Sequence, residues 1–192
     1  MNNLQSETKR IFVGIPVPKD VISRIQMLKT LVNAPPDDIR WIFGKNLHIT
    51  LSFLGHISDG NLDEVVNCLA KEVKQSAFDL TISGTGVFPD NNNPRIYWMD
   101  IEKGRDELIA LQAEIDKSVD HLKQKPGIRP YVPHVSIGRS IPKSKPWTFD
   151  IEHFLNAEYD VVKIAVNHIY LYMSELLPTG ARYTMLKDFS LK

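Results

Sequence analysis

The sequence has few of the features that mark secreted, membrane-spanning or disordered proteins. It contains one cysteine, Cys68, so no disulfide can form within the chain and a disulfide-stabilised secreted scaffold is excluded. No apolar run approaches the roughly 20 residues needed to cross a bilayer. The first ten residues lack the apolar segment of a signal peptide. We therefore expect a cytoplasmic protein that contacts no membrane.

An excess of charge of either sign is also missing. The 23 Lys and Arg residues balance 23 Asp and Glu residues, so any preference for anions must be local. Two segments, 39–58 and 121–149, contain no acidic residue. Their basic residues are Arg40, Lys45, Lys123, Lys125, Arg129, Arg139, Lys143 and Lys145. These two positive segments indicate an anionic substrate.

The composition is that of a soluble globular protein. With 43% hydrophobic residues, and only 10 Gly and 12 Pro, the chain is neither disordered nor fibrous. Its length of 192 residues suits one domain or two small lobes that share a core. We expect a single domain over residues 1–192, and a monomer.

Periodicity predicts mixed α and β structure. A β-branched and aromatic run predicts a strand at 10–15, and apolar residues at helical spacing predict a helix at 21–31. From residue 47 to 53 apolar and polar residues alternate, which places His48, Thr50 and Ser52 on one face of a strand. The other expected elements are a helix from 58 or 59 to 73, strands at 78–83, 87–88 and 95–101, a helix at 108–122 followed by a stop at 126–127, a strand at 133–138, and a hairpin of 161–173 and 181–186 with its turn at 178–180.

The two halves of the sequence resemble each other. Arg10 precedes His48 by 38 residues and Arg95 precedes His134 by 39, each across a predicted strand and helix. Each histidine is followed two residues later by a hydroxyl residue on the same strand face, Thr50 or Ser136. The pattern indicates an internal duplication, with units at about 10–55 and 95–139 that bring both motifs to a shared cleft.

Two imidazoles and two hydroxyls favour acid–base chemistry on phosphorus. Zinc would require further His, Cys or carboxylate ligands at short spacing, and none lies beside either histidine, so we expect no metal and no cofactor. The sequence also lacks the Gly-x-Ser-x-Gly turn of many serine hydrolases. One neutral and one protonated imidazole can instead activate a nucleophile and protonate a leaving oxygen, while the hydroxyls bind the phosphate.

These motifs resemble those of the 2H phosphoesterase superfamily, and most closely its branch of RNA 2',3'-cyclic phosphodiesterases, also called 2'-5' RNA ligases. The main matches are HITLSFLG at 48–55 and PHVSIGR at 133–139. Shorter matches are RIFV at 10–13, RW at 40–41, FP at 88–89, PR at 94–95 and GARY at 180–183. The resemblance implies an α+β fold of two lobes, with two antiparallel sheets lining a central cleft and helices outside. It also implies metal-independent hydrolysis of RNA 3' ends or nucleotides bearing a 2',3'-cyclic phosphate, which yields a 2'-phosphate.

The resemblance further implies roles for individual residues. His48 would donate a proton to the departing 3'-oxygen and His134 would accept one from water. Thr50 and Ser136 would hold the phosphate, although the family usually has threonine where this chain has Ser136. Arg139 would add positive charge, although on a regular strand it has the opposite parity from His134.

Aromatic residues beside the motifs could stack a terminal base. The candidates are Trp41, Phe53 and Tyr183, for which core packing is the competing interpretation. Phe53 in particular has the parity of the apolar face. His56 is expected in a loop at the mouth of the cleft.

Two alternatives to hydrolysis stay open at the level of the sequence. The chain could be a nucleotide-binding or RNA-end-binding module without turnover. It could also catalyse the reverse reaction, 2'-5' ligation, with the same two imidazoles.

Overall fold

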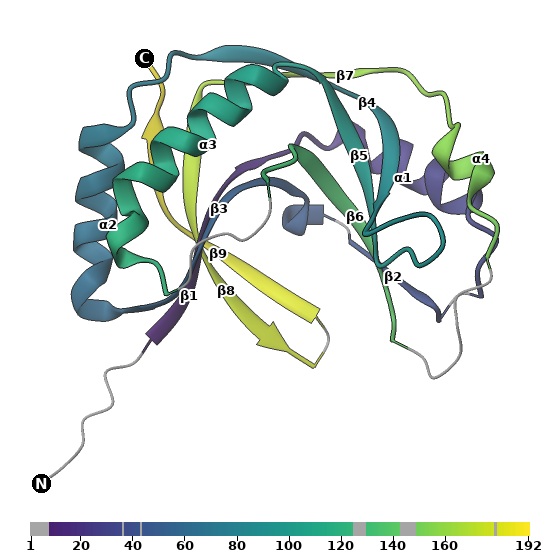
Figure 1. Ribbon diagram of the computed structural model, residues 1–192, viewed down its shortest axis with the longest axis horizontal. Coiled ribbons are helices and arrows are strands. Elements are labelled where there is room, and N and C mark those ends of the chain that lie inside the picture. Colours follow the sequence, from purple (N-terminus) through teal and green to yellow (C-terminus); the bar gives the residue numbers. More distant parts are fainter. Residues whose placement is uncertain (1–7, 36, 43, 125–129, 143–148, 179) are drawn as a thin grey trace, which may run out of the picture.

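The computed structural model describes residues 8–35, 37–42, 44–124, 130–142, 149–178 and 180–192. A strongly curved antiparallel sheet runs through the molecule (Figure 1). Its strands are β1 (Thr8–Pro16), β2 (Ile39–Trp41), β3 (His48–Ser58), β4 (Phe78–Phe88), β5 (Ile96–Lys103), β6 (His134–Ser140), β7 (Val162–Val166), β8 (His168–Leu177) and β9 (Gly180–Ser190). The helices are α1 (Asp20–Thr30), α2 (Asp59–Glu72), α3 (Arg105–Val119) and α4 (Glu152–Leu155), with 3₁₀ turns at Gly44–Asn46 and Asp120–Leu122. The expected α+β class with antiparallel strands is confirmed.

The sheet is continuous but has two halves. The strand order is β7-β4-β5-β6-β3-β1-β8-β9, and β2 pairs with β6. The first half contains β3, β1, β8 and β9, and the second contains β7, β4, β5, β6 and β2. Between β3 and β6 a single residue pair, Ile49 with Val135, joins them. The expected two separate sheets are therefore one nine-stranded sheet, because the two motif strands pair at this point.

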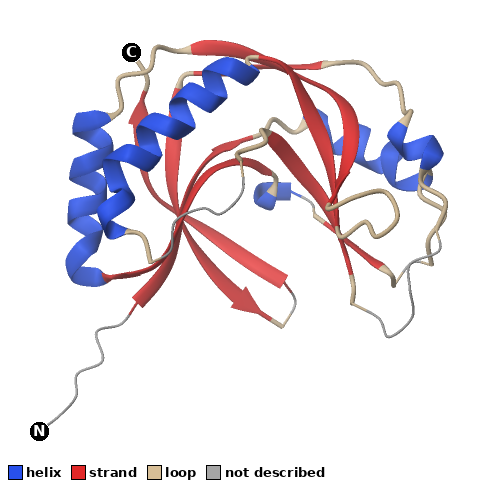
Figure 2. Cartoon of the chain, viewed as in Figure 1, coloured by secondary structure: helices blue, strands red, loops and turns tan. Residues whose placement is uncertain are grey.

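The helices cover the outer side of each half and exchange halves along the chain. Figure 2 shows the α-helices gathered at the two ends of the curved sheet. α3 follows β5 of the second half but packs with α2 against β3 of the first. α1 follows β1 of the first half, yet its Arg24 lies against Asp160, which precedes β7 of the second. α3 therefore covers the half of the sheet to which its preceding strand does not belong, and α1 contacts the segment that leads into β7.

Apolar faces at helical spacing explain this packing. The buried residues of α3 include Leu108, Leu111, Ile115 and Val119, which repeat every three or four positions. They belong to one core that extends under both halves of the sheet. Burying each such side chain contributes about 1.5–3 kcal/mol, so the core couples the two halves energetically.

Three predicted element boundaries are wrong. The segment expected as one strand at 161–173 breaks at Asn167 into β7, which pairs with β4, and β8, which pairs with β1 and β9. The strands expected at 78–83 and 87–88 are a single strand, β4, which is irregular near Gly84, where φ is +81°. His56, expected in a loop, lies within β3.

Some predictions fall outside the described residues. They are the helix stop at 126–127, the basic residues at 125, 129, 143 and 145, and the central position of the turn at 178–180. Cys68 is a free thiol on α2 that packs against the core. No helix in the described part of the chain is long and apolar enough to cross a membrane.

Candidate active site

The two His-x-hydroxyl motifs meet where the halves of the sheet join. Ile49 and Val135, the central residues of the motifs, pair with each other and are fully buried in the core. Side chains alternate between the two faces of a strand, so the residues on either side of this pair project from the opposite face. These flanking residues are His48, Thr50, His134 and Ser136. The sequence motifs thus come together on one face of the sheet.

Both histidines have the same hydrogen bonds. The Nδ1 of His48 donates to the carbonyl oxygen of Asn46, and the Nδ1 of His134 donates to that of Val132, each at 2.7 Å. A carbonyl oxygen only accepts hydrogen bonds, so Nδ1 carries a proton and Nε2 is the nitrogen that can gain or lose one. Nε2 is therefore the reactive nitrogen of each ring.

Each Nε2 faces the hydroxyl of its own motif. The Oγ1 of Thr50 lies 3.0 Å from Nε2 of His48. The Oγ of Ser136 lies 3.1 Å from Nε2 of His134. Two imidazole–hydroxyl pairs of the same geometry thus stand on either side of the junction, which suits a single anionic group held between them.

Burial lowers the pKa of both histidines below the ordinary 6.5, because the charged imidazolium loses hydration. The hydrogen bonds from Nδ1 to the backbone oppose this effect. The positive charge of Arg139 lowers the pKa of both rings further, and His134 acts likewise on His48. Asp100 raises the pKa of His134. Both rings therefore lose their proton at a lower pH than a fully hydrated imidazole does.

Each motif strand has a β-bulge immediately after its hydroxyl residue. In β3 the extra residue is at Leu51, because Thr50 and Ser52 pair with successive residues of β1. In β6 the extra residue is at Ile137, because Ser136 and Gly138 pair with the successive residues Trp98 and Tyr97 of β5. A bulge reverses the alternation of the side chains that follow it.

The bulges bring two further residues to the face of the histidines. Phe53 and Arg139 each lie three residues after the hydroxyl of their motif and were expected on the other face. Phe53 is 55% exposed, and its ring lies 5.7 Å from that of Phe12. Arg139 is exposed, and its charge acts on both histidines. The core-packing interpretation of Phe53 and the regular parity assumed for Arg139 are wrong, because the strands are not regular at these points.

The same bulge removes Ser52 from the polar face. The alternation placed it beside His48 and Thr50, but only 4% of Ser52 is exposed. Its Oγ has no hydrogen-bond partner among the described residues. The predicted row of three polar side chains is therefore a row of two.

The other two aromatic candidates, Tyr183 and Trp41, lie in different parts of the structure. The ring of Tyr183, on β9, lies 5.1 Å from that of His48 and 4.9 Å from that of Phe12. Trp41, on β2, pairs with Gly138 and packs against the core, 5.9 Å from the ring of Tyr97. Tyr183 therefore lies in the site, whereas Trp41 belongs to the core.

Aromatic rings that were not predicted as site residues lie against both histidines. Phe12 lies 4.9 Å from His48 and stacks on Tyr172 at 5.0 Å. Phe88 lies 5.1 Å from His134, edge-on, and stacks on Trp98. These residues occur in strands rich in apolar residues, so only the pairing of the strands reveals that they face the site.

Two arginines are directly opposite each other on β2 and β6, the strand that carries His134. Arg40 of β2 pairs directly with Arg139 of β6, and both side chains are exposed. Like charges directly opposite in an antiparallel pair destabilise a sheet, and a bound anion would offset this repulsion. In the described part of the chain, no group of three or more His, Cys, Asp or Glu residues could hold a metal ion. The arrangement is suited to an anion.

Comparison with known proteins identifies many relatives. An RNA 2',3'-cyclic phosphodiesterase of Thermotoga maritima is 28% identical over 184 residues, which cover 93% of this chain and 94% of the relative. One of Aquifex aeolicus is 31% identical, covering 95% and 97%. One of Escherichia coli is 28% identical, covering 97% and 98%.

Solved structures share the fold. LigT of Escherichia coli, crystallised with 3'-AMP, superimposes with a TM-score of 0.75 at 24% identity and covers 96% of this chain and 99% of LigT. Crystals of LigT with phosphate superimpose with a TM-score of 0.71. The family model of the 2'-5' RNA ligase superfamily matches residues 17–175, which include both histidine motifs. With most of its length matched, this chain belongs to the 2'-5' RNA ligase superfamily.

Proposed function

We propose that this protein is an RNA 2',3'-cyclic phosphodiesterase that hydrolyses terminal 2',3'-cyclic phosphates to 2'-phosphates. The observation that carries the proposal is the matched pair of imidazole–hydroxyl units, with both Nε2 atoms on one face of the sheet. The relatives in Thermotoga maritima, Aquifex aeolicus and Escherichia coli are named for this activity.

Hydrolysis requires a base on one side of the phosphorus and an acid on the other. We assign His134 to take a proton from water and His48 to give a proton to the departing 3'-oxygen. Asp100 pairs with His134 across β5 and β6 and raises its pKa, so it favours the imidazolium that forms when His134 accepts the proton. The charge of His134 lowers the pKa of His48, whereas Arg139 lowers the pKa of both rings and so does not distinguish them. Asp100, which acts on His134 and not on His48, is the asymmetry that supports the assignment of His134 as the base.

Negative charge gathers on the non-bridging oxygens as water attacks. The hydroxyls of Thr50 and Ser136 can donate to these oxygens, and the guanidinium of Arg139 adds positive charge on the same face. Serine lacks the β-methyl group that fixes the rotamer of threonine. Ser136 can therefore turn between His134 and a bound phosphate more freely than Thr50 can turn at its own site.

The two motif regions also support an origin by duplication within one domain, with units at about 10–55 and 95–139. Both units have the same hydrogen bonds at the histidine and a bulge after the hydroxyl. The alignment of the two units from the sequence, which matches Arg10 with Arg95, differs by one residue from the alignment that the strand pairing gives. Phe12 pairs with Phe53, whereas Ile96 pairs with Arg139, so Phe12 corresponds to Ile96.

The dependence of kcat/KM on pH should reflect the lowered pKa values of His48 and His134. Catalysis needs one imidazole protonated and the other neutral, and kcat/KM reports on the free enzyme. Because both pKa values are below 6.5, the singly protonated form falls about tenfold per pH unit above that value. We expect a bell-shaped profile of kcat/KM with its maximum below pH 6.5. Initial rates at low substrate from pH 4.5 to 9, with unfolding curves as the control, check this. A profile level up to pH 8 would contradict it.

Stacking of the terminal base on Phe53 is a further expectation. Phe53 is an exposed ring beside His48 and Thr50, and base stacking on an aromatic side chain contributes about 1–3 kcal/mol. Phe53→Ala should raise KM for adenosine 2',3'-cyclic phosphate about tenfold or more with little change in kcat. Trp41→Phe, a change in the core, is the matched control. An unchanged KM in Phe53→Ala would place the base elsewhere.

The proposed activity is tested by the product. The enzyme is incubated with a nucleoside 2',3'-cyclic phosphate and the product is identified by phosphorus NMR. The proposal requires a 2'-phosphate. A 3'-phosphate would contradict the assignment of the leaving oxygen, and tight binding without turnover would favour a binding module instead.

A further inference from the structure

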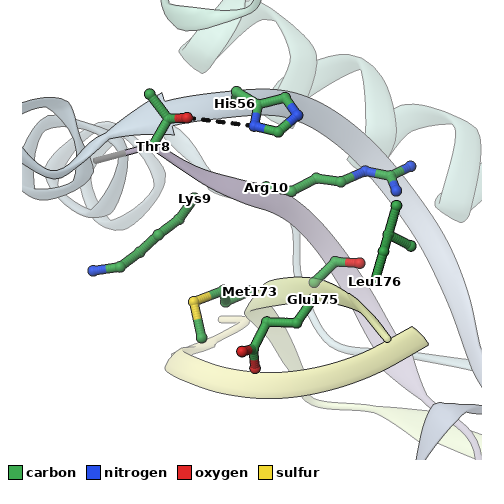
Figure 3. A pocket seen from close by; sticks show the side chains of 8 residues that line it. Thr8, Lys9, Arg10, His56, Met173, Glu175 and Leu176 are labelled. Atoms are coloured by element: carbon green, nitrogen blue, oxygen red, sulfur yellow. Dashed lines mark hydrogen bonds between the residues drawn. The ribbon is translucent and has the colours of Figure 1, made fainter. Parts of the chain in front are cut away.

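A pocket that the proposed reaction does not use lies on the same half of the sheet as His48. It is a pocket of about 430 Å³ between the ends of β1, β3 and β8. Its lining residues are Thr8, Lys9, Arg10, His56, Met173, Ser174, Glu175 and Leu176. In Figure 3 the side chain of Arg10 extends through the pocket between His56 of β3 and Leu176 of β8.

The strand register connects this pocket to the catalytic face. Directly paired residues of antiparallel strands project to the same side. Along β1 and β3 the row that contains Thr50 is followed by the row of Phe12 with Phe53. A second bulge in β3, at Leu54, then brings His56 to the same face, in the row of Arg10 with His56. Rows on one face are about 7 Å apart. The pocket therefore lies one row beyond the exposed ring of Phe53, in the direction away from the histidines.

Among the charged side chains that line the pocket, Arg10 is the one without a carboxylate partner in the described part of the chain. Lys9 pairs with Asp59 at 2.8 Å. Glu175 accepts two hydrogen bonds from Arg182, at 2.9 and 3.0 Å, so its charge is compensated. Arg10 has no ion-pair partner among the described residues, although its side chain is half-buried. A half-buried guanidinium without a carboxylate is a site for an anion of matching geometry.

We propose that this pocket binds the phosphodiester on the 5' side of the terminal nucleotide of an RNA that ends in a 2',3'-cyclic phosphate. The inference rests on the proposed function. With the cyclic phosphate between the histidines and the terminal base on Phe53, the chain continues toward the next row. There the guanidinium of Arg10 takes the phosphodiester oxygens, and His56 and the hydroxyl of Ser174, which pairs with Arg10, can donate to them.

The consequence is a preference for oligonucleotides over mononucleotides. A charge-assisted contact contributes about 1.5–3 kcal/mol, or roughly tenfold or more in affinity. The wild type should hydrolyse a dinucleotide 2',3'-cyclic phosphate with a kcat/KM about tenfold above that of the mononucleotide. A dinucleotide with an uncharged methylphosphonate linkage should lose this advantage.

The test compares these three substrates in wild type, Arg10→Gln and His56→Gln. R10Q should lower kcat/KM for the dinucleotide about tenfold and leave the mononucleotide unchanged, and H56Q should lower only the dinucleotide value by about threefold. Arg24→Gln removes the same charge from α1 and should change neither. Calorimetric binding of a dinucleotide 2'-phosphate to wild type and R10Q provides a measurement that does not depend on turnover.

Three results would overturn the subsite. They are equal kcat/KM for mononucleotide and dinucleotide in the wild type, an equal loss on both substrates in R10Q and H56Q, or unchanged binding of the dinucleotide 2'-phosphate in R10Q. Failure of the wild type to hydrolyse either substrate would contradict the proposed function. In that case a difference in binding between wild type and R10Q would still support the subsite.

Discussion

Replacing His48 with alanine is expected to lower kcat by about 10²–10⁴-fold, the contribution of a positioned acid or base. His134→Ala should have an effect of the same size, because each imidazole performs one of the two proton transfers. KM should change little, since the hydroxyls and Arg139 remain to bind the phosphate. The measurement is the steady-state hydrolysis of a nucleoside 2',3'-cyclic phosphate by the two variants.

His168→Ala is the matched control for both substitutions. His168 is a half-buried histidine on β8 whose Nε2 lies 3.1 Å from the Oγ of Ser190, outside the site. Its loss removes a packed imidazole without touching the chemistry, so kcat should stay at the level of the wild type. A kcat of His48→Ala or His134→Ala within a few-fold of that of His168→Ala would contradict the proposed roles.

Replacing Arg139 with glutamine is expected to lower kcat/KM by about 10²-fold, because a positive charge at the phosphate stabilises the transition state. The same substitution should move the alkaline limb of the pH profile to higher pH. Arg139 lowers the pKa of both histidines, so its removal raises both values and keeps one imidazole protonated to higher pH. Profiles of kcat/KM against pH for wild type and R139Q measure both effects.

Arg24→Gln, which removes a charge from α1, should shift neither the rate nor the profile. A loss of rate in R139Q without any shift of the alkaline limb would mean that Arg139 acts only on the substrate. A shift toward lower pH would contradict the electrostatic coupling of Arg139 to the histidines.

The residues of the two motifs could be predicted from the sequence, but the way in which the two motif strands meet could not. The alternation at 47–53 placed His48 and Thr50 on one face, and the repeated motif pointed to His134 and Ser136 as their partners. That the two motifs meet at the pair Ile49 and Val135 depends on a contact between distant segments, which periodicity cannot encode. For the same reason the single continuous sheet was not foreseen.

The bulges account for the errors around the site. Alternation assumes regular strands, and one extra residue reverses the side chains that follow it, as far as the next bulge. Regular alternation therefore assigned Phe53, a candidate for base stacking, to the apolar face and Ser52 to the polar face, whereas the structure exchanges them. Phe12, although part of the matched run at 10–13, is not predicted as a site residue for another reason. It lies in the apolar run at 11–15, where no polar residue distinguishes the site face from the core face.

The break between β7 and β8 at Asn167 has no signal in the sequence. The residues on both sides of it are β-branched, aromatic and alternating, which is typical of one long strand. In the structure the chain crosses there from β7 of one half of the sheet to β8 of the other. Only the partners of each segment, not its composition, decide this.

The central claim is that two imidazoles act as one unit without a metal ion. Its most direct test is single-turnover hydrolysis of a 2',3'-cyclic phosphate RNA end in excess chelator by wild type, His48→Ala, His134→Ala and the double variant. Residues that act together have non-additive effects. The account predicts full activity of the wild type in chelator, and a double variant no more than a few-fold slower than either single variant. Loss of wild-type activity in chelator, or effects of the two substitutions that multiply in the double variant, would contradict it.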